Sequence, residues 1–119
     1  AKTVLVWHVD AEALSRNAQV LQSHPWFQLQ SEDATHYTVR LPGVVDDVVR
    51  ENKIYSDRLD AEAKEVGLVL AKRRSLLDMI TLWKNHPLLS GSYERVCTNP
   101  MLSVLCEIYV VALYDKNVL

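Results

Sequence analysis

The chain has 119 residues, enough for one domain with one hydrophobic core. Hydrophobic residues make up 49% of it and charged residues 24%, which is typical of globular proteins and argues against disorder over most of its length. The net charge of −2 excludes a global positive field of the kind that draws nucleic acid or an anionic membrane to a protein.

The first residues predict a strand followed by a helix. The stretch from Lys2 to Val9 is rich in β-branched and aromatic residues and has apolar residues on both faces, which indicates an interior strand. Asp10 is a good N-cap, and the apolar residues after it follow helical spacing from Ala11 to about Ser23. Pro25 then ends the helix, because a residue before proline is pushed out of the α region.

Two alternating stretches, FQLQ and THYTVRL, come next and predict a hairpin with a polar connection. The first 43 residues therefore have the order β-α-β-β. Alternation places one set of side chains toward the core: Phe27, Leu29, Tyr37, Val39 and Leu41.

The segment 44–86 has a different character, with many charges of both signs, no proline and a single glycine, Gly67. Apolar residues recur at alternating steps of three and four from Val45 to Trp83, which favours one long amphipathic helix. Two alternatives stay open here: two helices joined near Gly67, or a short strand in the sequence VGLVL.

The N-terminal half of this predicted helix carries only a narrow apolar stripe, as a coiled-coil helix does. A helix of about 40 residues is roughly 60 Å long and would project beyond a domain of this size. Its stripe would need a partner, most simply a second copy of the chain, in a homodimer. The residues we predict at this interface are Val45, Val48, Asn52, Tyr55, Leu59 and Glu62.

The segment 87–119 predicts a loop and then a buried C-terminal helix. Thr98 or Asn99 can cap this helix, with Pro100 in its first turn, where proline is tolerated. The residues from Met101 to Tyr114 are apolar on every side, so periodicity alone also allows a strand. The fold class we predict is α+β in a single domain: a small sheet packed against one long or broken helix and a C-terminal apolar helix.

Sequence motifs for catalysis are absent. The four histidines lie in four separate predicted elements, and no helix carries ligands at metal-binding spacing, so we expect no metal and no cofactor. The sequence repeats a His-Pro pair at His24 and His86, which we interpret as helix termination. A small enzyme that pairs Cys97 or Cys106 with a histidine is the third functional hypothesis.

The first hypothesis is a non-enzymatic protein-interaction or oligomerisation domain. The second is a nucleic-acid accessory protein, which would contact phosphate through the one local basic cluster: Lys72, Arg73 and Arg74. The longest apolar stretch falls short of the roughly 20 residues that span a bilayer, so we expect no membrane segment. Two isolated cysteines suit a reducing compartment, which predicts an intracellular, most simply cytoplasmic, protein.

Overall fold

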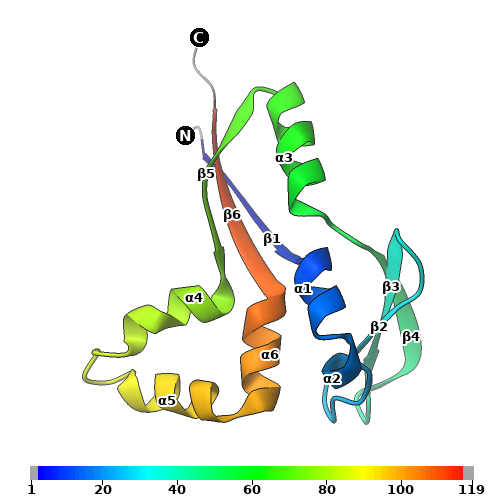
Figure 1. The fold of residues 1–119 in the computed structure, drawn as a ribbon, viewed down its shortest axis with the longest axis vertical. Helices are drawn as coiled ribbons and strands as arrows, with labels where there is room; N and C mark the ends of the chain where they lie inside the picture. The colour runs from blue at the N-terminus through cyan, green and yellow to red at the C-terminus, as the bar shows by residue number, and fades with distance from the viewer. Residues whose placement is uncertain (1–2, 117–119) are drawn as a thin grey trace.

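The computed structural model describes residues 3–116 and contains two small antiparallel sheets with helices around them (Figure 1). The first sheet has the strand order β1-β6-β5 and the second β2-β3-β4. The strands are β1 (Thr3–Val9), β2 (Gln28–Ser31), β3 (His36–Leu41), β4 (Val45–Asn52), β5 (Leu68–Ser75) and β6 (Tyr109–Lys116). The helices are α1 (Ala11–Arg16), α2 (Ala18–Gln22), α3 (Ser56–Glu65), α4 (Leu76–Ile80), the 3₁₀ helix η1 (Thr81–Trp83), α5 (Ser90–Thr98) and α6 (Pro100–Ile108).

The α+β class is thus confirmed, but the predicted long helix over 44–86 is wrong. This segment forms β4, α3, β5 and α4 in turn. Gly67 separates α3 from β5: its φ is +82°, and its N–H donates to the carbonyl of Lys64 at 3.1 Å, which closes the helix end. The short strand that VGLVL left open is therefore the correct alternative for this position.

The strand β1 is predicted correctly in type and position, with Lys2 outside the described residues, but it is not an interior strand. The centre of the sheet is β6, and β1 lies at an edge. Within β1, the consecutive residues Val4 and Leu5 point to opposite faces of the sheet, and their side chains are 44% and 60% exposed. Apolar residues on both faces here belong to an edge strand that α3 covers on one face, at Val6 and His8, and that is exposed on the other.

The Asp10 cap is confirmed, because its Oδ2 accepts a hydrogen bond from the N–H of Ala13 at 3.0 Å. The predicted helix after it is split into α1 and α2 at Asn17. There the Asn17 side chain donates to the carbonyl of Ala13 at 2.8 Å, and its backbone leaves the helical region. A side chain that competes for a helix carbonyl in this way interrupts the helix.

The hairpin of β2 and β3 is confirmed, with Leu29 and Tyr37 buried and Phe27 and Val39 packed against the same core.

The cap at Asn99 and the position of Pro100 are confirmed as well, since the Asn99 side chain accepts from the N–H of Met101 at 3.0 Å. The apolar stretch after it is a helix up to Ile108 and a strand from Tyr109, so each alternative holds for one half.

Two hydrophobic clusters hold these elements together. The larger joins the ends of β1 and α6 to α1, α2 and the second sheet: Val9, Ala13, Leu14, Leu21, Leu29, Tyr37, Val104 and Ile108. The smaller lies between α3 and the first sheet, around Ala63, Ala112 and Tyr114. No helix within residues 3–116 is long and apolar enough to cross a membrane.

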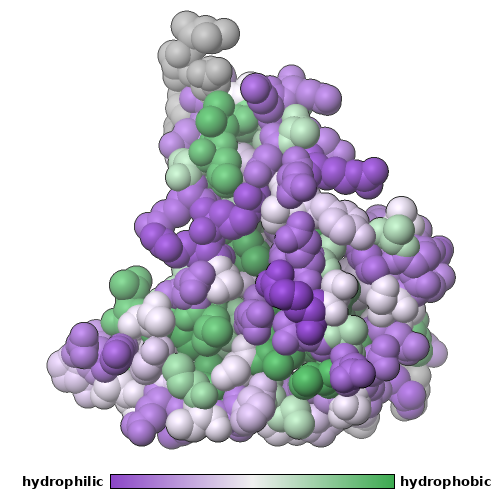
Figure 2. Space-filling model, viewed as in Figure 1, coloured by the Kyte–Doolittle hydropathy of each residue, from purple (hydrophilic) through white to green (hydrophobic). Residues whose placement is uncertain are grey.

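The molecule is flat and open, with extents of 49 × 42 × 23 Å. Its Cα radius of gyration is 16.2 Å, whereas a compact chain of this length has about 13.5 Å. Its accessible surface of 8038 Å² exceeds that of a compact monomer of this mass by roughly 1,500 Å². Hydrophobic residues are visible over the first sheet in the upper part of Figure 2. Such an open fold leaves apolar surface available to a partner.

Candidate interaction surfaces

The basic cluster predicted at Lys72, Arg73 and Arg74 lies on β5 rather than on a helix. Successive side chains of a strand point to opposite faces. Lys72 and Arg74 therefore share one face of the first sheet, and Arg73 lies on the other, beneath α3. Of the three predicted phosphate contacts, Lys72 and Arg74 thus lie on the same face, and Arg73 lies on the opposite one.

Arg73 is held by α3 and β6. Its guanidinium donates to both carboxylate oxygens of Asp60, at 2.9 and 2.5 Å, and to the hydroxyl of Tyr114 at 3.1 Å. The Tyr114 hydroxyl in turn donates to Asp60 at 2.5 Å. We call these three residues the Arg73 cluster. Because Arg73 is paired with Asp60, its charge is not available for the phosphate contact that the nucleic-acid hypothesis assigned to it.

The electrostatics of the Arg73 cluster follow from this geometry. The hydrogen bonds from Arg73, supported by the one from Tyr114, hold the pKa of Asp60 below its ordinary value. The bond to Asp60 raises the pKa of Arg73. Burial, together with the bond to Asp60, raises the pKa of Tyr114 to about 12. All three groups are thus fixed in one charge state near neutral pH, which suits a structural ion pair.

His8 lies on the same covered face of the sheet and is buried. Its Nδ1 is 3.0 Å from the carbonyl of Val9, and its Nε2 has no hydrogen-bond partner among the described residues. The Nε of Arg73 is also buried without a partner there. Neither residue lines the hollow beside Lys72 and Arg74 or the one beside Thr35 and Arg58, both described below. The polar groups under α3 therefore do not form an accessible site.

The six predicted interface residues do not share one surface, because the helix that would align them is not formed. Val45, Val48 and Asn52 lie exposed on β4. Tyr55 donates its hydroxyl to the carbonyl of Ala34 at 2.7 Å. The remaining two lie on α3, with Leu59 packed in the smaller core and Glu62 exposed.

The outer edge of β4 is poorly suited to pairing with another strand. Its register with β3 shifts between Val39 and Leu41, which marks a bulge, and its sequence VDDVVREN is half charged. Bulges and charges are the devices by which edge strands avoid further pairing. Arg50 is also occupied, since it forms a 3.0 Å ion pair with Glu32.

The strand β1 differs from β4 on each of these points. Its register with β6 is regular over all seven residues, and its sequence TVLVWHV contains no acidic residue, lysine or arginine. Leu5 and Trp7 are 60% and 52% exposed. No strand within residues 3–116 pairs with its outer edge before Val9, and the only neighbour beyond is the bridge from Asp10 to Ile54.

The face of the first sheet opposite α3 is the second prominent surface, which we call the open face. The registers order its side chains in three rows across β1, β6 and β5: Trp7, Val111 and Arg74; Leu5, Leu113 and Lys72; Thr3, Asp115 and Val69. The apolar side lies on β1 and the cationic side on β5. Sequence analysis missed this surface, because it requires the pairing of strands far apart in the chain.

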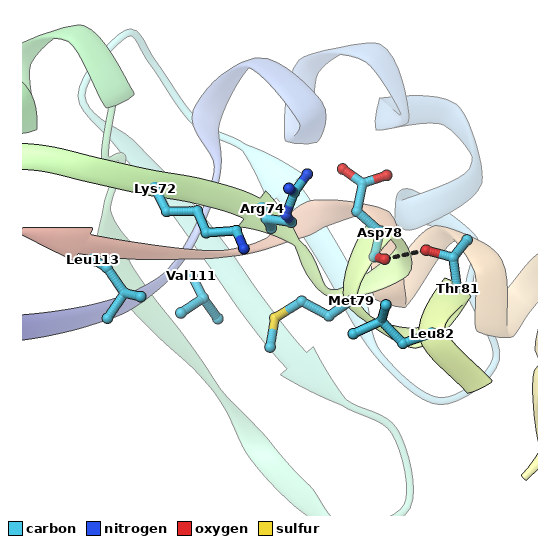
Figure 3. A pocket seen from close by; sticks show the side chains of 8 residues that line it. All are labelled: Lys72, Arg74, Asp78, Met79, Thr81, Leu82, Val111 and Leu113. Atoms are coloured by element: carbon cyan, nitrogen blue, oxygen red, sulfur yellow. Dashed lines mark hydrogen bonds between the residues drawn. The ribbon is translucent and has the colours of Figure 1, made fainter. Parts of the chain in front are cut away.

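A hollow of about 580 Å³ lies on the open face where β5 and β6 meet α4. Figure 3 shows Lys72 and Arg74 projecting from β5 and Val111 and Leu113 from β6, with Met79 and Leu82 forming the opposite wall. A second hollow, of about 360 Å³, lies between Thr35 and Arg58.

The third hypothesis, a cysteine paired with a histidine, has no supporting contact in the described residues. Cys97 is exposed, and Cys106 is partly buried, which raises the pKa of its thiol. No hydrogen bond links a cysteine to a histidine in residues 3–116, and no group of three or more His, Cys, Asp or Glu side chains there could hold a metal ion.

Within residues 3–116, these features define an α+β fold with two small antiparallel sheets, an open face on the first sheet and an exposed, uncharged edge at β1. No model of a known protein family matches the chain, and no curated protein matches it significantly.

Proposed function

We propose that this chain is a non-enzymatic protein-interaction domain that forms a homodimer by pairing the outer edges of two β1 strands. The observation that carries this proposal is the regular, uncharged and exposed edge from Thr3 to Trp7. An exposed apolar edge strand is a template for pairing with another chain. The proposed interface therefore lies on β1 and not on the residues between 45 and 62 that the sequence predicted.

The hydrogen bonds of β1 indicate which backbone groups are free. The N–H of Asp10 donates to the carbonyl of Ile108 at 2.8 Å, so the backbone N–H of Asp10 is directed to the β6 side of the strand. Because backbone groups alternate along an antiparallel ladder, those of Val4, Val6 and His8 point toward β6 too. The N–H and C=O groups of Thr3, Leu5 and Trp7 then point outward.

The end of the free edge selects the pairing register. The N–H of Ala11 donates to the carbonyl of Ile54 at 3.0 Å, so the segment at Ile54 occupies the edge beyond Val9. A symmetric antiparallel pair confined to Thr3–Trp7 is centred on Leu5. Leu5 then lies opposite Leu5 of the second copy, Thr3 opposite Trp7, and Val4 opposite Val6.

This arrangement joins two sheets into one of six strands. Every cross-strand pair is apolar or joins Thr3 to Trp7, and such pairs contribute about 0.2 to 1 kcal/mol each. The cationic strands β5 lie at the two outer edges, so their charges are far apart. The excess surface of roughly 1,500 Å² per chain is larger than the roughly 800 Å² that each partner buries in a standard specific interface, so the open fold has surface enough for one.

Sedimentation velocity at micromolar concentrations tests the proposal. We expect the chain to sediment as an elongated dimer and Leu5→Lys to sediment as a monomer, because the lysine places a charge at the two-fold axis. Val69→Lys is the matched control, since Val69 is exposed on the same face at the opposite edge of the sheet. A monomeric wild type, or equal loss of dimer in both variants, would contradict edge pairing.

Amide hydrogen exchange gives a second readout that depends on the direction of single N–H groups. In the dimer we expect protection of the outward amides of Leu5 and Trp7, and this protection should disappear on dilution. The amide of Val6, which bonds to β6, should stay protected in both states. Dimerisation without concentration-dependent protection of Leu5 would indicate a different interface.

A further inference from the structure

The hollow on the open face has a cationic side and an apolar side. Lys72 and Arg74 come from the edge strand β5, and neither forms an ion pair with a carboxylate in the described part of the chain. Every other side of the hollow except Asp78 and Thr81 is aliphatic or thioether: Met79, Leu82, Val111 and Leu113.

Neither cation of the hollow is taken up by an ion pair within residues 3–116, although the carboxylate of Asp78 lines the same hollow (Figure 3). Arg73, between them in sequence, takes the carboxylate of Asp60 on the opposite face. Asp78, the acidic residue nearest along the chain, lines the hollow but makes no ion pair with Arg74 within residues 3–116. An anion that entered here would therefore meet two cationic donors that no ion pair occupies, against one carboxylate.

The same lining limits the charge of the ligand. Asp78 would repel a second negative group, and the net charge of −2 disfavours polyanions. Arg74 has the planar fork that binds a carboxylate through two parallel hydrogen bonds, and Lys72 adds a point charge. One negative group is thus favoured over a row of phosphates.

We infer that this hollow binds a monocarboxylate with an aliphatic body. The carboxylate would lie between Lys72 and Arg74, and the apolar body would cover Val111 and Leu113 against the wall of Met79 and Leu82 (Figure 3). A volume of about 580 Å³ falls in the range of roughly 300 to 1,000 Å³ that is usual for small-ligand sites.

This inference is independent of the proposed dimer. The hollow lies at β5 and α4, and the proposed pairing uses the edge of β1 at the other side of the sheet. Both surfaces can be occupied at once. Leu5→Lys, which tests the dimer, leaves the lining of the hollow unchanged and should bind the same ligand.

Isothermal titration with sodium decanoate below its micelle-forming concentration tests the inference. We expect one decanoate per chain and weaker binding of decanol, which has the same apolar body without the charge. The double variant K72Q/R74Q should lose at least about tenfold in affinity, as loss of charge-assisted hydrogen bonds predicts. The control R40Q/K64Q removes the same two charges from exposed positions elsewhere and should bind as the wild type does.

The apolar wall needs its own variant. Leu82→Ser should weaken decanoate binding several-fold, and methyl NMR shifts should report the ligand at Leu113 and Met79. Equal affinity for decanol and decanoate, or an unchanged affinity of K72Q/R74Q, would overturn the inference. Binding of an oligothymidylate in place of decanoate, with loss in K72Q/R74Q, would also overturn it and favour a nucleic-acid surface.

Discussion

The guanidinium of Arg73 and the carboxylate of Asp60 form a two-point ion pair between β5 and α3, at 2.9 and 2.5 Å. The pair is partly buried, with 23% and 32% of the two side chains exposed. It connects the helix to the edge strand of a sheet whose other face is open. The attachment of α3 to the first sheet therefore depends on a polar contact as well as on the smaller core.

Asp60→Asn should lower the free energy of unfolding by about 1 to 3 kcal/mol, since it leaves a partly buried guanidinium without its counter-charge. Glu62→Gln on the same helix removes an exposed carboxylate and should stay within about 0.5 kcal/mol of the wild type. Urea denaturation followed by circular dichroism measures both. Equal effects of the two substitutions would show that the ion pair contributes nothing.

The same pair predicts acid sensitivity. Hydrogen bonds from Arg73 hold the pKa of Asp60 below its ordinary value of 3.8. A group whose pKa is lower in the folded state stabilises the fold above its unfolded-state pKa. That contribution is lost as the pH falls below 3.8 and through the folded-state pKa.

Urea unfolding between pH 6 and pH 2 checks this expectation. The wild type should lose stability toward low pH more steeply than Asp60→Asn, so the difference between the two proteins should shrink as the pH falls. Asp33, whose pKa is lowered by hydrogen bonds from Thr35 and His36, acts in the same range in both proteins and cancels. A difference that is constant with pH would contradict the assignment.

The local signals in the sequence predicted local structure well. Asp10, Asn99 and the alternation around Tyr37 each act within a few residues, and the elements they predict are present. The helix prediction for the segment 45–52 is wrong, because its valines fit both a heptad stripe and a strand. Pairing of Tyr37 and Val39 with Glu51 and Val49 decides between them, and this contact between separate strands leaves no periodic signal.

The candidate sites failed for a related reason. A helix would spread Lys72, Arg73 and Arg74 around its axis at about 100° per residue, whereas the strand places Lys72 and Arg74 on one face and sends Arg73 to the opposite face. Val4 and Leu5 suggested an interior strand, because apolar residues on both faces predict burial and say nothing about which strand is central. The edge position of β1 depends on pairing with β6, whose residues lie at least 100 positions along the chain from their partners in β1.

The two His-Pro pairs give a matched test of burial. His24 is fully buried; its Nδ1 accepts from the N–H groups of Trp26 and Phe27 at 3.1 and 3.3 Å, so its Nε2 carries the hydrogen donated to Met101 O at 3.2 Å. His86 accepts one bond, from the N–H of Leu88 at 3.0 Å, and is exposed. In both pairs a proline follows the end of a helix, but only His24 bonds to a distant element, through the carbonyl of Met101 in α6.

His24→Ala should therefore cost about 2 to 4 kcal/mol, because it opens a cavity and leaves buried backbone groups unpaired. His86→Ala should change stability by less than about 0.5 kcal/mol. Chemical denaturation of both variants, with the same probe, decides the matter. Comparable losses would mean that each histidine acts only through its own turn.

Gly67 and Gly91 separate backbone conformation from steric contact. A Cβ added at either position meets no atom within 4 Å, but Gly67 has a φ of +82° while Gly91 lies in α5. Gly67→Ala should cost about 1 to 2 kcal/mol, since side chains disfavour the left-handed region. Gly91→Ala should stabilise by about 0.5 kcal/mol through helix propensity. Thermal and urea unfolding should show opposite signs, because only Gly67 must turn the chain from α3 into β5; two effects of the same sign would contradict this role.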